Sequence, residues 1–139
     1  MCNIKYYIDE TAAYFGNMLG EKVALEPADK DLLEGIPMNV SSRFSFYKGC
    51  ILGQHILMAY LKDGDSVPPA QLKKQLDIIG RQTQLVVVLI TPCISSYNKV
   101  RLVAQKVNFV IPNRQMFLPS LCCFIICRLN PLLGQQVMD

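Results

Sequence analysis

The chain has 139 residues, about the length of one domain, and this size allows a single hydrophobic core. Apolar residues make up 51% and charged residues 18%, which excludes disordered, collagen-like, coiled-coil and strongly basic nucleic-acid-coating proteins. The net charge of +3 is unevenly spread: residues 1–40 hold seven acids and three bases, whereas residues 41–139 hold eleven bases and four acids. Such a distribution gives either a dipolar surface that steers a charged partner or an ordinary solvated surface.

The first half of the chain predicts one long helix and three strands. Apolar residues at helical spacing over 7–19, followed by Gly20 as a cap, predict the helix. Residues 21–40 are acidic, contain two prolines and predict a loop or a short helix near 29–33. Alternating polar and aromatic residues over 43–47 predict a half-buried strand that Gly49 breaks. The apolar run 50–61 predicts a strand, a tight turn or bulge at Gly53, and a second strand.

The second half predicts a β-α-β unit. Two prolines open a helix over 69–80, which ends at Gly80 and has an inward stripe of Leu72, Gln75, Leu76 and Ile79. The six aliphatic residues of 85–90 predict a central strand buried on both faces. A serine-capped helix over 97–105 is expected to direct inward Val100, Val103 and Ala104. Strand 107–111 follows, and we expect it to run parallel to strand 85–90 through a right-handed crossover.

Together these elements predict an α/β domain over residues 1–119, with a mixed β-sheet flanked by helices. Their order, α-β-β-β-α-β, is also that of the restriction-endonuclease core, so we expect that strand order without the catalytic motif. Residues 120–139 are predicted to form an apolar, cysteine-rich C-terminal tail, whose nearly all-apolar run over 121–127 is shorter than a membrane span of about 20 apolar residues requires. If neither this fold nor a partner chain covers it, the tail is aggregation-prone.

The strand ends do not carry a complete nuclease motif. A restriction-endonuclease site needs an acid on one strand, and an acid or Gln two residues before a Lys on the next, to hold Mg²⁺ beside the attacking water. Here Tyr60 stands two residues before Lys62, and Gln54 has Ile56 where the lysine belongs. We therefore expect no catalytic residues and no enzymatic activity. A degenerate or unconventional metal-dependent nuclease remains the alternative.

The residues also predict neither a metal nor a cofactor. Among six cysteines, only Cys123 and Cys127 have a spacing typical of zinc ligands, and no second pair completes a site. No apolar leader follows Met1, so we expect a cytoplasmic protein with buried free thiols. The sole histidine, His55, lies in an apolar run and is expected to be structural rather than a catalytic base. Residues 91–96 follow a strand but lack the glycine that a phosphate-binding loop requires.

The most specific pattern lies within residues 71–119. It reads ISSYNKVRL over 94–102 and FVIPNRQMFLP over 109–119. This pattern resembles the N-terminal region of bacterial transcriptional regulators of the MarR type, in which a segment reading SSYxRxRLIxxxxxFIVPGxQMYLP follows an aliphatic strand. Residues 46–59 are similar too, so the resemblance covers about residues 10–120. Asn113 stands where those proteins often have Gly, and Asn can replace Gly in a left-handed turn.

The resemblance implies a non-catalytic regulatory or interaction domain, which full-length regulators join to a DNA-binding winged helix. This chain departs from that pattern after Pro119, because the apolar tail replaces the acidic helical stretch and the winged helix. A truncated or frameshifted gene has this form, and DNA binding is implied only through the full-length architecture.

We expect the partner to be a second copy of the chain or another protein. The candidate partner or ligand contacts are Ser95, Ser96, Tyr97, Lys99, Arg114, Gln115 and Met116. Two alternatives stay open: these residues serve only in helix capping and packing, or the chain oligomerises through its tail.

Overall fold

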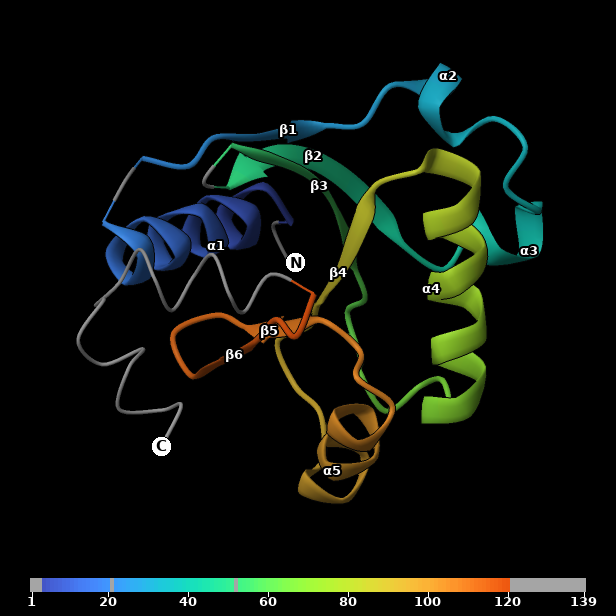
Figure 1. The fold of residues 1–139 in the computed structure, drawn as a ribbon. Coiled ribbons are helices and arrows are strands. Elements are labelled where there is room, and N and C mark those ends of the chain that lie inside the picture. The colour runs from blue at the N-terminus through green and yellow to red at the C-terminus, as the bar shows by residue number, and fades with distance from the viewer. Residues whose placement is uncertain (1–3, 21, 52, 121–139) are drawn as a thin grey trace.

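A six-stranded mixed sheet with helices on both faces forms the molecule (Figure 1). The computed structural model describes residues 4–20, 22–51 and 53–120. The strands are, in chain order and also in sheet order, β1 (Leu25–Pro27), β2 (Ser45–Ile51), β3 (Gln54–Tyr60), β4 (Val86–Ile90), β5 (Phe109–Ile111) and β6 (Gln115–Phe117). The helices are α1 (Ile4–Leu19), α2 (Lys30–Leu33), α3 (Met38–Ser41), α4 (Pro69–Thr83) and α5 (Ser96–Ala104). The expected α/β class with a mixed, helix-flanked sheet is confirmed.

The strand directions divide the sheet into three parts. β1, β2 and β3 form an antiparallel meander, β3, β4 and β5 are parallel, and β6 pairs antiparallel with β5. The parallel arrangement of β4 and β5 around α5 confirms the predicted β-α-β unit. Both faces of β4 and of residues 56–60 in β3 are covered, so these segments are continuous apolar runs rather than alternating ones. Val88, Leu89 and Ile90 are accordingly fully buried.

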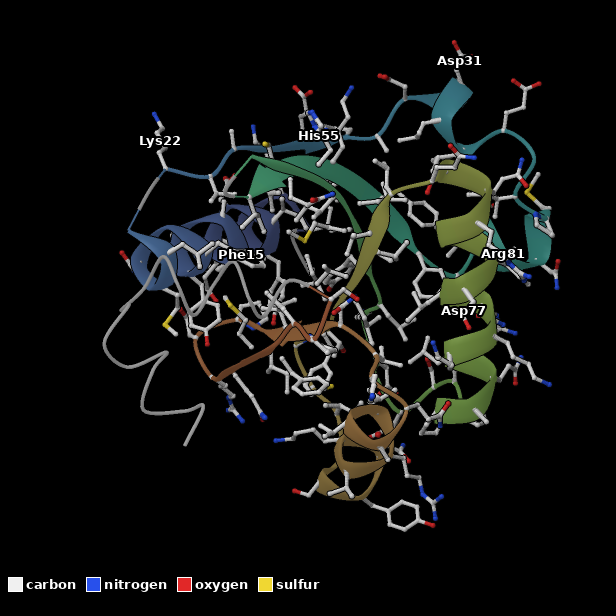
Figure 2. The ribbon with its side chains drawn as sticks, viewed as in Figure 1. Phe15, Lys22, Asp31, His55, Asp77 and Arg81 are labelled. Carbon is white, nitrogen blue, oxygen red and sulfur yellow. The ribbon has the colours of Figure 1, made fainter. Side chains whose placement is uncertain are left out.

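The sheet separates two apolar layers. α1 covers one face through Phe15, which is fully buried and points toward the sheet (Figure 2). α4 covers the opposite face, and its buried residues are Pro69, Leu72, Gln75, Leu76 and Ile79. These include the whole predicted stripe. Each layer excludes water from one side of the same two central strands, which makes the parallel pair the middle of the fold.

Gly49 and Gly80 were predicted to end a strand and a helix, but both elements continue through them. β2 runs through Gly49 without a break, and Gly49 pairs with Leu25 on the neighbouring strand β1. A Cβ atom at Gly49 would lie 2.5 Å from Leu25 Cδ2, so a larger residue there would displace the Leu25 side chain. α4 continues past Gly80 to Thr83 and ends at Gln84, which adopts a left-handed conformation with φ of 59°. Asn113 also has a left-handed φ of 65°, as predicted for the turn before β6.

The predicted orientation of α5 is wrong. Val100 is 68% exposed and Val103 is 38% exposed, whereas the one buried residue of α5 is Leu102. The reason is the position of the helix, because α5 lies at the end of the sheet rather than across its face (Figure 1). Among the described residues, protein therefore packs against only one side of this short helix.

The described chain ends at Ser120, which is tied to the start of β5. The Ser120 N–H donates to Asn108 Oδ1 at 3.1 Å, and Asn108 Nδ2 donates to Ser120 Oγ at 3.1 Å. The rest of the predicted tail lies outside the described residues. Within the described part of the chain, no helix is long and apolar enough to cross a membrane.

Candidate functional site

The N-terminus of α5 is held by a carboxylate from a distant loop. Ser95 is the N-cap residue, and its Oγ accepts from the Asn98 N–H at 3.2 Å, as the sequence predicts. Asp65, in the loop between β3 and α4, accepts from the Ser95 N–H at 3.0 and 3.1 Å, from Ser95 Oγ at 3.0 Å and from Asn98 Nδ2 at 2.7 Å.

These contacts make Asp65 the anion at this helix terminus. The hydrogen bond from the Ser95 backbone is the largest influence, and it holds the pKa of Asp65 below its usual value. Partial burial opposes this shift, and the side chains of Asn98 and Ser95 reinforce it. The weak anion-binding role that a helix N-terminus can play is therefore filled here by a side chain of the chain itself.

The outer side of α5 combines exposed apolar residues with positive charge. Tyr97 is 67% exposed, and the Arg101 guanidinium lies 4.3 Å from its ring centroid and also donates to its hydroxyl. Val100 is 68% exposed. We call the set Tyr97, Lys99, Val100, Arg101, Val103 and Lys106 the α5 surface. It includes two of the predicted contact residues, Tyr97 and Lys99, whereas Ser95 and Ser96 lie at its capped end.

The remaining predicted contacts lie on a different element. Arg114 is an exposed turn residue, and its N–H donates to the Ile111 carbonyl at 2.9 Å. Gln115 and Met116 begin β6, and half-buried Met116 packs against the apolar layer on the α1 side. Figure 1 shows α5 projecting from the end of the sheet, away from β6. The structure thus divides the seven candidates between two separate regions.

A tyrosine pair lies between α1 and the end of β3. The Tyr7 and Tyr60 ring centroids are 5.5 Å apart. Burial is the main cause that raises the pKa of Tyr7 to about 12, and the nearby Tyr60, Glu10 and Cys93 add to it. The positive charge of Arg114 acts in the opposite direction. The Tyr7 ring is therefore neutral at physiological pH and packs against the Tyr60 ring.

A small polar cavity adjoins this pair. It has a volume of about 290 Å³ and is lined by Ile4, Arg43, Ser45, Tyr60 and Lys62. We call it the strand-end cavity, because Ser45 begins β2, Tyr60 ends β3, and the two are cross-strand partners. Tyr60 and Lys62, examined in the sequence as remnants of a nuclease motif, are thus brought together with Arg43.

A second cavity holds a cysteine beside the sole histidine, and sequence reasoning missed this pair. Cys50 and His55 are direct cross-strand partners on β2 and β3, and both are exposed. They line a cavity of about 490 Å³ together with Glu26, Asp29 and Lys48. Ile51 pairs with Gln54 in the antiparallel ladder, which places Cys50 directly opposite His55, so the turn predicted at Gly53 was the signal.

The second exposed free cysteine is Cys93, in the loop between β4 and α5. The expectation of buried thiols is therefore wrong for both Cys50 and Cys93. Within the residues that the structure describes, no group of three or more His, Cys, Asp or Glu side chains is placed to hold a metal ion.

No protein-family model, curated protein or solved structure matches the chain. The resemblance to MarR-type regulators and the restriction-endonuclease-like strand order stay predictions of the sequence.

Proposed function

We propose that the chain is a non-catalytic, cytoplasmic regulatory or interaction domain of a MarR-like, DNA-binding transcriptional regulator, and that it acts through the α5 surface. The regulator class rests on the resemblance over residues 71–119. The interaction role rests on one structural observation: α5 leaves Tyr97 and Val100 about two-thirds exposed beside a group of cations. Exposed apolar side chains that adjoin one another are typical of surfaces that bind another protein.

The positive charge of the α5 surface determines which kind of partner can bind it. The α5 surface carries Lys99, Arg101 and Lys106, and the sequence has no Asp or Glu between Asp77 and Asp139. A symmetric pair of α5 surfaces would bring two sets of these cations together, which like-charge repulsion opposes. The occupant must therefore be acidic.

A complementary acidic surface exists on the same chain. Residues 26–34 hold four acids and one lysine, and exposed Met38 follows them at 79% exposure. Lys48 pairs with Glu26 and Asp29 at 3.6 and 3.0 Å, which leaves Asp31 and Glu34 without an ion pair to a described residue. Asp31 points outward from α2 (Figure 2). We call residues 26–38 the acidic surface.

The two surfaces favour head-to-tail association of identical chains. Figure 1 shows α2 and α5 at opposite ends of the molecule, so they cannot meet within one chain. The α5 surface of one copy fits the acidic surface of the next, which is a heterologous contact. Opposite charges steer the encounter, and Val100 and Met38 supply apolar area at its centre.

Sedimentation velocity of the full chain tests this proposal. The expected result is association that increases with concentration and weakens at high salt. Val100→Glu should abolish it by placing a carboxylate in the apolar centre, and the double variant Asp31→Lys with Glu34→Lys should abolish it by reversing the acidic surface. Met18→Glu is the matched control, because it makes the same kind of change at a partly exposed position of α1.

Mixing the two defective variants gives the sharper test. Each retains one intact surface, so the mixture should form a heterodimer that stops at two copies. Association that both variants leave unchanged would overturn the proposal and assign oligomerisation to another segment, such as the tail at 120–139. A wild-type chain that stays monomeric at all concentrations would overturn it as well.

A further inference from the structure

The strand-end cavity brings together two positive charges that lack ion-pair partners among the described residues. Arg43 and Lys62 are both exposed at its rim, and no described carboxylate forms an ion pair with either one. Ser45 adds a hydroxyl to the lining. Unpaired cations held near one another repel, so their convergence favours an anion between them.

The backbone on both sides of the cavity is hydrogen-bonded to the fold. The Leu61 N–H donates to the Ile90 carbonyl at 2.9 Å, so the parallel ladder continues to the residue before Lys62. On the other side, the Arg43 N–H donates to the Val40 carbonyl at 3.1 Å in the turn that leads into β2. The two cations therefore project from backbone positions that the sheet and this turn define.

The strand-end cavity lies where open α/β sheets frequently bind ligands. The cavity lies at the carboxyl end of β3, which is parallel to β4, and ligands of open α/β sheets bind outside the carboxyl ends of parallel strands. Its volume of about 290 Å³ is near the lower end of the range of about 300–1,000 Å³ for small-molecule sites.

We propose that the strand-end cavity binds the oxyanion of a phosphate group. Arg43 supplies a planar fork of N–H donors that matches phosphate oxygens, Lys62 supplies a point charge, and Ser45 supplies a hydroxyl donor. No Asp or Glu lines the cavity, so its donors contact phosphate oxygens directly and need no bridging divalent cation. The phosphate belongs either to a free phosphate ester or to the phosphodiester backbone of a nucleic acid. This site is independent of the α5 surface.

Titration of the full chain by ¹H–¹⁵N NMR tests the site, with EDTA present throughout. One arm uses inorganic phosphate and the other a single-stranded oligothymidine. The expected result is saturable shifts of the Ser45 and Lys62 amide signals. Arg43→Gln and Lys62→Gln should each weaken binding about tenfold, the effect of one hydrogen bond to a charged group. Lys62→Arg should retain most of the affinity.

Lys22→Gln is the matched control, because Lys22 is an exposed cation that points to solvent (Figure 2) and follows the C-terminal end of α1, whereas Ile4 at the N-terminal end of α1 lines the cavity. It should leave both titrations unchanged. Equal weakening by Lys22→Gln would show diffuse attraction to a basic protein and would overturn the proposal. Binding that requires Mg²⁺ would also overturn it in favour of metal-bridged chemistry. Where the cavity variants act as expected, the arm with the tighter binding identifies the source of the phosphate.

Discussion

At the scale of single residues, Asp65 shows how one carboxylate positions a helix 30 residues away in sequence. It is the acceptor for three donors on Ser95 and Asn98, so its charged form is stabilised only in the folded chain. A group whose pKa is lowered by folding contributes stability that is complete above its unfolded pKa, here near 3.8, and is lost as the pH falls through the folded value.

Asp65→Ala should therefore destabilise the protein by about 0.5–1 kcal/mol at pH 7, the usual cost of losing an exposed helix cap. The difference from wild type should shrink below the unfolded pKa of Asp65. Urea unfolding at neutral pH and at about pH 3, below that value, measures both numbers. Asp9→Ala removes an exposed carboxylate of α1 and serves as the control. A difference that is independent of pH would contradict the role assigned to the Asp65 charge.

Cys50 should react faster with iodoacetamide than Cys93 does, although both thiols are exposed. Directly opposed cross-strand residues have Cβ atoms about 4.5–5.5 Å apart, so the His55 imidazole can accept the thiol proton as Cys50 attacks carbon and iodide leaves. Peptide mass spectrometry measures each rate in the same sample, with Cys93 as the internal control. His55→Gln should lower the Cys50 rate several-fold and leave Cys93 unchanged; an unchanged Cys50 rate would exclude assistance by the imidazole.

At the scale of elements, α5 has one buried side chain, that of Leu102. Leu102→Ala should cost about 2–5 kcal/mol, because Leu102 is fully buried in the layer beneath α4. Val100→Ala should change stability by less than about 0.5 kcal/mol, because Val100 is 68% exposed. Urea unfolding of the two variants compares them directly, and similar losses would mean that the outer side of α5 is covered in solution.

Elements with a strong local pattern can be predicted from the sequence, whereas elements that depend on contacts between distant residues cannot. The aliphatic run of β4 and the stripe of α4 are strong local signals, so both elements were predicted with small boundary errors. β1 and β6 have three residues each and exist through pairing with β2 and β5, which no local pattern encodes. The pattern of α5 fits an inward Val100 as well as an inward Leu102, and only the place of the helix beside the sheet decides between them.

The candidate sites show the same difference between local contacts, which the sequence predicts, and long-range contacts, which it does not. A cap by Ser95 or Ser96 was predicted, because a cap acts within one helical turn, and the structure shows Ser95 in this role. The contact between Ser95 and Asp65 was not predicted, because these residues are 30 positions apart in the sequence and come together only in the folded chain. The pairing of Cys50 with His55 follows from the hairpin turn, whereas the meeting of Arg43 with Lys62 depends on the register of β2 against β3.

At the scale of the whole molecule, the two apolar layers depend on the same central strands. Ile56, Met58 and Tyr60 face the α1 layer, whereas Leu57 and Ala59 face the α4 layer, and all five belong to β3. Neither layer can lose its packing without exposing one face of this strand. The domain should therefore unfold as one cooperative unit.

Phe15→Ala tests this cooperativity from the α1 side. Removing this fully buried ring should cost about 3–5 kcal/mol, which is a large part of the stability of a domain of this size. If the layers unfold together, hydrogen exchange of Leu72 and Ile79 amides in α4 should accelerate roughly 100- to 4,000-fold, as much as exchange in α1 does. Acceleration confined to α1 would mean that α1 detaches alone and that the α4 layer is stable without it.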